Sequence, residues 1–390
     1  MSTMTEEHTQ LSEILEFVCK ALDIREELYQ DAKQSADDLS EWLSADHIRR
    51  FQSDAQIYHQ GSMRLGTSVR PVREGDEYDV DLVYRREIRK ESTTQEQLKH
   101  DLGDQLHEYV RHVAQSGEAP PTLKEGLRCW TLKYDGRFHL DILPSLPDDE
   151  AAIHNLRDVA DGIIITDKDL REWQHSNPKG FANWFNEKQG ALIHERQEAI
   201  AREANVDVES VPSERVPTPL RRAVQILKRH RDIQYQGSLD DKPASIVITT
   251  LAAQAYRYEE DDLSALMAIV PGMRNHIEKR GGIYWVENPI NPGENFADRW
   301  ERKPQRAARF FEWLGKVESD LRAVTQQKGL QKIGASLGSA LGEDIVHRAL
   351  EEYGSTIDNR HQEGRLRMAP KTGLLGAAGT VVKRNTWYGD

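Results

Sequence analysis

The sequence has few cysteines, no long apolar run and no excess of basic residues. Its two cysteines, Cys19 and Cys129, stand alone, without the paired spacing of a zinc ribbon that grips DNA. No stretch of about 18 apolar residues occurs, so we expect no membrane span and no membrane partner. The first residues, MSTMTEEHTQ, are acidic and lack the basic and apolar parts of a signal peptide, which favours a cytoplasmic location.

Charge excludes a further class of protein. The formal net charge is −13, from 52 basic against 65 acidic residues, whereas a dedicated nucleic-acid binder is normally basic. A local basic pocket for a small polyphosphate is compatible with this balance. The length of 390 residues, with 38% hydrophobic and 30% charged residues, indicates a globular protein large enough for two lobes.

Two aspartates lie one residue apart on a predicted strand. The stretch Tyr78 to Tyr84 (YDVDLVY) is rich in β-branched and aromatic residues, as strands are. Because alternate side chains of a strand share a face, Asp79 and Asp81 project together, while Val80 and Leu82 pack inward. Two adjacent carboxylates repel each other unless a cation lies between them, and hard oxygen ligands suit Mg²⁺. The spacing therefore predicts a metal-binding pair.

A Gly-Ser turn precedes this strand. Tyr58 to Gln60 is typical of the end of a strand, and Gly61 permits a tight turn close to a ligand. The backbone N–H groups after it, with the Ser62 hydroxyl, form the kind of nest that holds an anion such as a triphosphate.

A third aspartate lies on a predicted hairpin. Asp135-Gly136 separates two alternating runs, RCWTLKY and RFHLDIL, and favours a type I′ turn. In the second run Arg137, His139 and Asp141 share the face opposite the apolar residues. An aspartate within such a strand is costly unless it is paired or metal-bound, so Asp141 is the candidate third ligand. A solvated strand edge would explain any one of these aspartates; their combination with the turn favours a metal-dependent site.

These motifs resemble those of a known family. The wording QGSMRLGTSVRP, EYDVDLV and HLDILPS is similar to that of the bacterial cGAS/DncV-like nucleotidyltransferases (CD-NTases), which belong to the polymerase-β-like superfamily and act in CBASS anti-phage defence. The resemblance covers residues from about 55 to about 300. It implies an α+β fold: a polymerase-β-like core with a mixed sheet and flanking helices, plus a C-terminal helical lobe, with the active site in the cleft.

The predicted domain division follows from this resemblance and from composition. We expect a nucleotidyltransferase core with an N-terminal spine helix over residues 1–215, a helical lobe over 216–370 and a mobile tail over 371–390. The Pro-rich segment Val206 to Pro219 forms the junction. Residues 9–46 have the periodicity of one or two amphipathic helices, and residues 304–353 that of two helices.

Two positions of the second lobe are predicted to contact phosphate. Thr218 and Pro219 mark the start of a helix, and Ser245 opens the next one after Lys242-Pro243. Helix N-termini attract phosphate. In the resembled family a lysine of the first helix and a serine opening the second contact the donor triphosphate. The predicted nucleotide-binding residues are therefore Lys228 and Ser245, which the resemblance implies, together with Gln60, Gly61 and Ser62 at the turn.

The implied activity is that of a cyclic oligonucleotide synthase. It joins NTPs, ATP among them, into a cyclic di- or trinucleotide with release of pyrophosphate, using two Mg²⁺ ions for which Mn²⁺ can substitute. Asp79, Asp81 and Asp141 are the predicted catalytic residues and metal ligands. A downstream effector senses the product, and no DNA activator is expected. Some relatives are joined through their C-terminus by a ubiquitin-transfer-like partner; Tyr388-Gly389 fits such a partner, whereas the additional Asp390 does not.

Two alternatives share the same triad. One is a template-independent nucleotidyltransferase acting on RNA or protein. The acidic net charge argues against RNA as its substrate. The other is a non-catalytic nucleotide sensor, which the presence of all three aspartates disfavours.

Overall fold

The computed structural model describes residues 6–44, 55–73, 75–150, 159–166, 172–238, 241–370, 372–376 and 379–383. It packs as two compact units. We call residues 24–217 with 285–296 the sheet unit, and residues 1–23, 218–284 and 297–390 the helical unit. The predicted conjugation segment around Tyr388-Gly389 lies outside the described residues.

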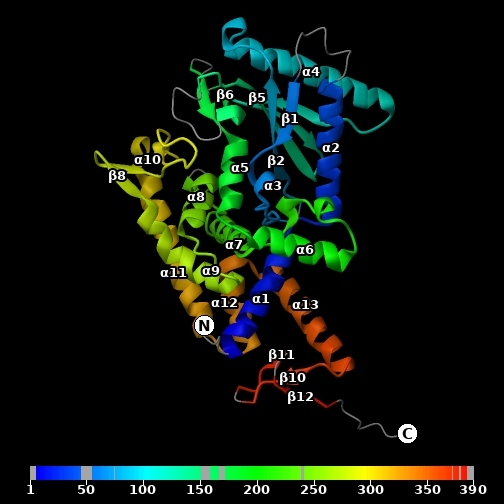
Figure 1. The fold of residues 1–390 in the computed structure, drawn as a ribbon, viewed down its shortest axis with the longest axis vertical. Coiled ribbons are helices and arrows are strands. Elements are labelled where there is room, and N and C mark those ends of the chain that lie inside the picture. The colour runs from blue at the N-terminus through cyan, green and yellow to red at the C-terminus, as the bar shows by residue number, and fades with distance from the viewer. Residues whose placement is uncertain are drawn as a thin grey trace. The chain divides into compact units, whose positions relative to one another are not determined.

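The sheet unit is built on a mixed sheet (Figure 1). Its order is β1-β2-β5-β4-β3, with β6 pairing β5 and β7 pairing β6. The strands are β1 (Ala55–His59), β2 (Tyr78–Arg86), β3 (Thr122–Glu125), β4 (Trp130–Tyr134), β5 (Phe138–Pro147), β6 (Ile163–Ile165) and β7 (Gln174–Ser176). The helices are α2 (Glu26–Ser44), α3 (Gly61–Leu65), α4 (Gln95–Ser116), α5 (Pro178–Glu187) and α6 (Leu192–Ala204).

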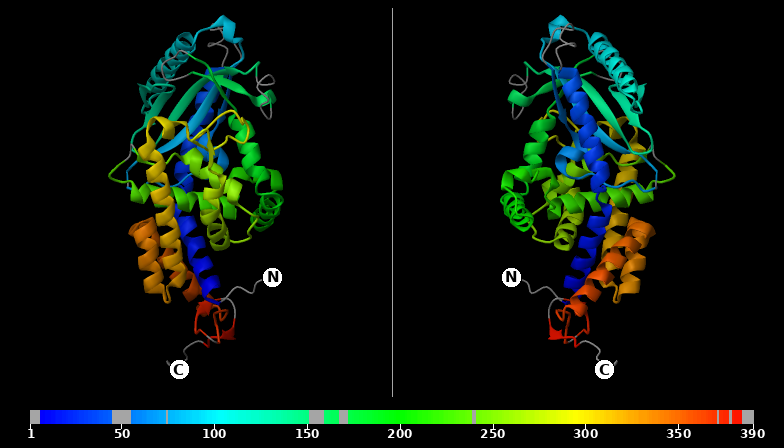
Figure 2. Two further views of the ribbon diagram at one scale, coloured as in Figure 1. Left: turned by 90° about the vertical axis from the view of Figure 1, so that its left-hand side faces the viewer. Right: turned by 90° about the vertical axis from the view of Figure 1, so that its right-hand side faces the viewer.

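One face of this sheet is buried. The alternating residues Tyr78, Val80, Leu82 and Tyr84 of β2 join one apolar core with residues of β5, α2 and α4. Figure 2 shows α2 and α4 beside that face. Burial of each large apolar side chain stabilises the fold by roughly 1.5–3 kcal/mol, so this register is strongly specified. The intervening residues of β2, Asp79 and Asp81 among them, are thereby directed to the opposite face.

The hairpin of β4 and β5 forms as predicted, but its turn differs from the prediction. Tyr134 pairs with Phe138, so the connection has three residues rather than two. Gly136 has φ +65°, and Asp135 does not have positive φ. The type I′ prediction is therefore wrong, since the longer connection requires a left-handed residue at Gly136 only.

The helical unit contains more helices than predicted. Its helices are α1 (Glu6–Leu22), α7 (Pro219–Gln234), α8 (Ser245–Ala255), α9 (Asp262–Gly272), α10 (Asp298–Arg302), α11 (Pro304–Gln326), α12 (Leu330–Leu341) and α13 (Glu343–Gln362). A short hairpin of β8 (Glu278–Arg280) and β9 (Ile283–Trp285) lies between α9 and α10. The two helices predicted over residues 304–353 are three, because Gly329 and Gly342, with φ +85° and +98°, interrupt the periodic run.

The N-terminal residues belong to a different unit from the one predicted. The stretch predicted as one or two helices forms two, and α1 packs against α7, α9 and α13 of the helical unit, whereas α2 packs in the sheet unit. An amphipathic pattern shows that a helix has a buried face but not which element covers it. Residues 285–296 likewise pack with the sheet unit, although they were predicted to belong to the helical lobe.

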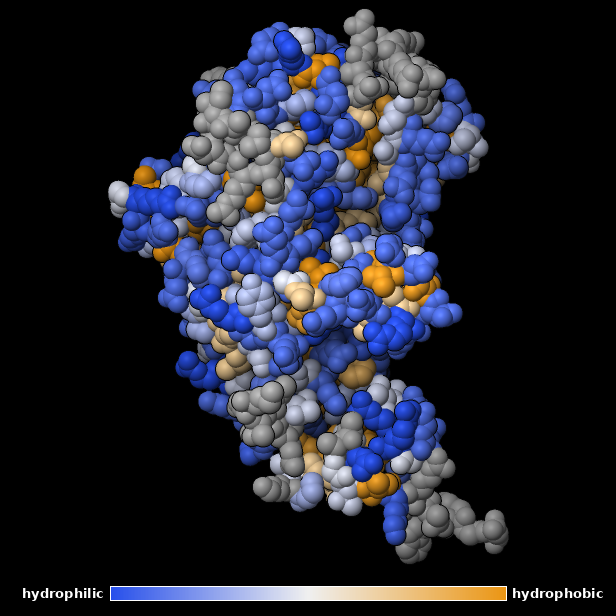
Figure 3. All heavy atoms as spheres, in the orientation of Figure 1, coloured by the Kyte–Doolittle hydropathy of each residue, from blue (hydrophilic) through white to orange (hydrophobic). Residues whose placement is uncertain are grey.

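Part of the predicted tail is paired. Strands β10 (Arg367–Met368), β11 (Leu375–Gly376) and β12 (Thr380–Val381) form a small antiparallel sheet in the order β11-β10-β12. The predicted mobile tail beyond residue 371 therefore includes two strands. Among the described residues, no helix combines the length and the apolar character needed to cross a membrane. The face of the molecule in Figure 3 is mostly hydrophilic, in line with the mean hydropathy of −0.71.

A buried histidine makes the stability of the helical unit depend on pH. The His230 Nδ1 accepts a hydrogen bond from Trp313 Nε1 at 3.1 Å, and its Nε2 lies 3.0 Å from Asp320 Oδ2. These contacts suit the neutral ring, and burial lowers the pKa of His230 below its usual 6.5, with Asp320 opposing the shift. The unfolded chain binds this proton more readily than the folded chain. The free energy of unfolding should therefore fall as the pH drops below about 6.5, by up to about 1.4 kcal/mol per pH unit.

Urea unfolding at about pH 7.5 and about pH 5.5 tests this expectation. The loss of stability on acidification should be smaller in His230→Gln than in the wild type. The control is His347→Gln, in which the replaced side chain is 73% exposed. Equal losses in all three proteins would contradict the assignment.

Candidate active site

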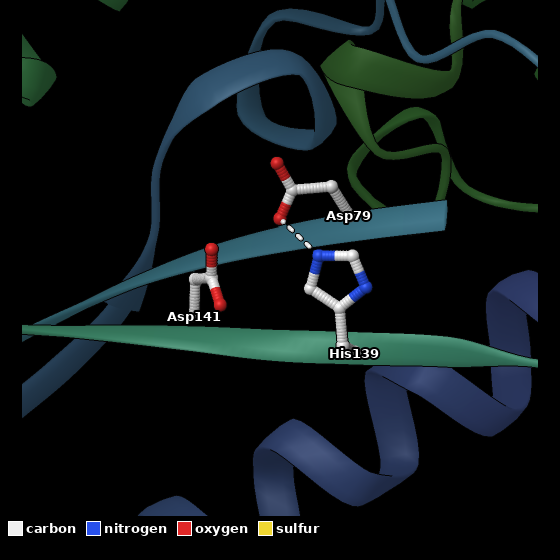
Figure 4. A group of neighbouring side chains, drawn as sticks. All are labelled: Asp79, His139 and Asp141. Atoms are coloured by element: carbon white, nitrogen blue, oxygen red, sulfur yellow. Dashed lines mark ion pairs between the residues drawn. The ribbon is translucent and has the colours of Figure 1, made fainter. Parts of the chain in front are cut away.

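The parallel pairing of β2 with β5 brings the predicted ligands together. Asp81 lies opposite Asp141 in the register, and Asp79 lies opposite His139. Ligand atoms of Asp79, His139 and Asp141 all lie within 4.8 Å of one another. Figure 4 shows the three side chains on the same side of the two strands. The later aspartate thus meets the first of the earlier pair on the face of the sheet opposite the apolar core, whereas the predicted group also included Asp81.

The carboxylate of Asp141 is half-buried and held in place. Thr131, its neighbour on β4, donates a hydrogen bond from Oγ1 to Asp141 Oδ1 at 2.6 Å. Burial raises the pKa of Asp141, and the charge of Asp79 raises it further, while the Thr131 hydrogen bond opposes the change. A carboxylate in this position gains from a nearby cation, which would offset both costs.

His139 is a site residue that the sequence motifs did not single out. Its Nε2 lies 3.4 Å from Asp79 Oδ1, and its Nδ1 lies 3.5 Å from Glu77 Oε2. The approach of Asp79 raises the pKa of His139, although burial opposes the shift. Lys133 binds Glu77 at 2.9 Å and lowers the pKa of that carboxyl. The signal was present in the sequence, because His139 shares the predicted face with Asp141.

Asp81 stands outside the group formed by Asp79, His139 and Asp141. Its carboxylate lies against Gly61 of the turn: a Cβ at residue 61 would be 2.0 Å from Asp81 Oδ2. Gly61 has φ +61°, so this position requires glycine for its backbone as well as for space. The Gln60 N–H also donates to the Asp81 carbonyl at 2.9 Å. The turn and the strand therefore fix each other.

The predicted turn is the start of a five-residue helix, α3. Gln60 is its N-cap in an extended conformation, without a side-chain capping hydrogen bond. The Ser62 and Ser68 hydroxyl oxygens lie 3.0 Å apart, so these two side chains share a hydrogen bond. Ser62 also accepts a hydrogen bond at its carbonyl from the Thr67 N–H at 2.9 Å. The Ser62 side chain is thus oriented by Ser68, beside the residues that hold Asp81.

Lys228 and Ser245 both lie in the helical unit. Thr218 caps α7 as predicted, accepting a hydrogen bond from the Arg221 N–H at 3.4 Å, and Lys228 is buried on that helix. Ser245 is the first residue of α8, and its hydroxyl accepts a hydrogen bond from Arg231 Nη1 at 2.7 Å. Arg231 therefore positions the start of α8, a role that its place in the α7 sequence did not reveal. The assignment of Lys228 and Ser245 to phosphate stays a prediction from the resemblance.

The side chains fit a divalent cation. Two carboxylates and an imidazole within 4.8 Å supply hard oxygen ligands and one nitrogen ligand, and Asp81 lies next in register. The residues that would hold the ions are Asp79, Asp81 and Asp141, and the His139 ring lies beside Asp79 and Asp141. Close carboxylates in this arrangement repel one another unless a cation is bound.

Known proteins share both the domain and the fold. Residues 55–144 match the family model described as "Cyclic GMP-AMP synthase DncV-like, nucleotidyltransferase domain". The chain is 27% identical over 394 residues to a c-di-GMP synthase of Roseivirga ehrenbergii, with 98% of each chain covered.

Solved structures agree on the fold. The CD-NTase CdnG of Bradyrhizobium diazoefficiens, in complex with GTP, matches with a TM-score of 0.68 at 22% identity, over 88% of this chain and 99% of that one. A CdnC:HORMA complex of E. coli matches with a TM-score of 0.60 at 15% identity, over 87% and 98%.

The fold and the matched domain define a nucleotidyltransferase of the polymerase-β-like superfamily. Within it, residues 55–144 form a DncV-like nucleotidyltransferase domain, as the motifs predicted, and the chain is similar over nearly its whole length to a named cyclic dinucleotide synthase.

Proposed function

We propose that this enzyme condenses NTPs into a cyclic dinucleotide, releasing pyrophosphate, and that guanine nucleotides are among its substrates. The observation that carries the proposal is the meeting of Asp79 and Asp141 across two parallel strands, next to Asp81 and the Gly61 turn. The relative named c-di-GMP synthase, which aligns over nearly the whole chain, supports a two-nucleotide product and GTP. The product would serve as a CBASS signal read by a downstream effector.

The residues divide the chemistry between them. Asp79, Asp81 and Asp141 would hold two Mg²⁺ ions, or Mn²⁺ in their place, and bound ions of this kind polarise the attacking hydroxyl and neutralise charge on the phosphates. The Asp141 carboxylate, which the Thr131 hydrogen bond orients, would also take up the proton of the attacking hydroxyl. Ser62, oriented by Ser68, would bind the donor triphosphate.

Further contacts with the donor rest on the resemblance. Lys228 and Ser245 would contact the same triphosphate. The backbone at Gln60 and Gly61 would allow the triphosphate to approach closely. Phosphoryl transfer needs positioning and electrostatic stabilisation more than covalent participation by the protein, so residues of these types are sufficient for the reaction.

The proposal is tested with labelled GTP and labelled ATP, supplied singly and together with Mg²⁺, and with no RNA or protein acceptor. We expect a phosphatase-resistant product with the mass of a cyclic dinucleotide, and no product from Asp79→Asn or Asp81→Asn. Mass spectrometry then identifies the bases.

Two other outcomes would reject the proposal in favour of the alternatives. Label found only on added RNA or protein would indicate a transferase acting on macromolecules. Thermal stabilisation by NTP without release of pyrophosphate would indicate a nucleotide sensor.

A further inference from the structure

The imidazole of His139 lies where a metal ligand would lie. Its Nε2 is 3.4 Å from Asp79 Oδ1, beyond the usual 2.7–3.2 Å of an N–H···O hydrogen bond. Two oxygen ligands at right angles on one ion, each about 2.0–2.1 Å from it, would lie about 3 Å apart. The 3.4 Å between His139 Nε2 and Asp79 Oδ1 is therefore a few tenths of an ångström from the spacing of neighbouring ligands, and it is longer than a usual hydrogen bond.

The other ring nitrogen faces a fixed carboxylate. His139 Nδ1 lies 3.5 Å from Glu77 Oε2 and has no hydrogen-bond partner among the described residues, and Lys133 holds Glu77 in place at 2.9 Å. Histidines that bind metals characteristically direct the second ring nitrogen at a carboxylate or carbonyl, which sets the tautomer and the ring orientation. Glu77 occupies that place here.

Asp141 supplies the third ligand from the same strand as His139. His139 and Asp141 are two positions apart on β5, so both side chains project from the same face toward Asp79 (Figure 4). The Thr131 hydrogen bond fixes one oxygen of Asp141 and so orients the carboxylate. Asp81, which completes the predicted triad, is turned to Gly61 and is not part of this group.

We propose that His139 is a direct ligand, with Asp79 and Asp141, of one divalent ion in the active site, and that it biases this site toward Mn²⁺ over Mg²⁺. Imidazole suits transition metals, whereas Mg²⁺ takes oxygen ligands almost exclusively. The inference deepens the proposed function, because it concerns the metal site of the same reaction. Metal ligation is nevertheless measured without nucleotides, so its failure is distinct from failure to form a cyclic product.

The test is pulsed electron paramagnetic resonance of the full-length protein with Mn²⁺ alone. We expect modulation from a directly bound ¹⁴N nucleus in the wild type and its loss in His139→Gln. The Mn²⁺ affinity should fall by roughly tenfold in this variant, with a much smaller change for Mg²⁺. The matched control is His100→Gln, whose side chain is 69% exposed on α4 and should leave both properties unchanged.

The wild-type spectrum alone decides the matter if the variant does not fold. No Mn²⁺ binding, Mn²⁺ bound without nitrogen modulation, or modulation that survives in folded His139→Gln would each overturn the proposal. A purely positioning role for His139 would predict a weakened site but no bound nitrogen.

Discussion

Replacing Asp141 with asparagine is expected to lower the rate of nucleotide condensation by roughly 10³-fold, because metal-held charge stabilisation is worth several kcal/mol. The replacement keeps the size of the side chain and an oxygen that can still accept from Thr131, so the strand should stay intact. It removes the negative charge that would hold the ion and take up the proton. The free energy of unfolding should not fall, since burial and Asp79 already disfavour the charged form of Asp141. Initial rates of pyrophosphate release and urea unfolding measure the two quantities.

The hairpin that carries Asp141 supplies a matched control. Asp135→Asn makes the same chemical change in the exposed turn, where asparagine followed by glycine is well tolerated. This variant should keep wild-type activity. Equal loss in both variants, or normal activity in Asp141→Asn, would remove Asp141 from the catalytic site.

Replacing Gly61 with alanine should also abolish most of the activity. The added Cβ would lie 2.0 Å from Asp81 Oδ2, so the carboxylate must move, and the backbone at φ +61° costs about 1–2 kcal/mol for a residue with a side chain. A displacement of about 1 Å at a reacting centre lowers the rate by about 10²-fold. Pyrophosphate release, together with the stability of the variant, measures this effect.

A second glycine separates the clash from the backbone strain. Gly136 has φ +65°, yet an added Cβ there would have nothing within 4 Å. Gly136→Ala should therefore show a similar loss of stability and full activity. If the two alanine variants have the same activity, a clash between the added Cβ and Asp81 is not the reason why residue 61 must be glycine.

Alternation along strands was the part of the site that could be predicted from the sequence. It placed Asp79 with Asp81, and His139 with Asp141, on the polar faces of β2 and β5, because the apolar partners of these residues must be buried. The parallel pairing that brings the two faces together is a long-range property of the sheet and leaves no local pattern. For the same reason, the sequence did not show that Asp81 faces Gly61 or that Glu77 lies behind His139.

The assignment of α1 shows a second limit. Its buried residues Leu11, Ile14, Leu15, Val18 and Leu22 follow the predicted helical spacing. A spacing of this kind fixes which side of the helix is apolar, whereas the choice of partner depends on the whole helical unit. Glycines with positive φ, such as Gly329 and Gly342, were similarly visible as residues but not as the ends of α11 and α12.

The helical unit is assembled from three separate stretches of the chain, residues 1–23, 218–284 and 297–390. The first helix of this unit is therefore synthesised long before the last, and α1 can make its contacts with α7 and α9, and later with α13, only after the sheet unit's main stretch has been made. Residues 24–217, which make up most of the sheet unit, are synthesised without interruption in the meantime. A single cut in the chain therefore cannot yield a fragment that contains the whole helical unit. Deletion of α1 should destabilise the helical unit, most of which is encoded in the second half of the sequence.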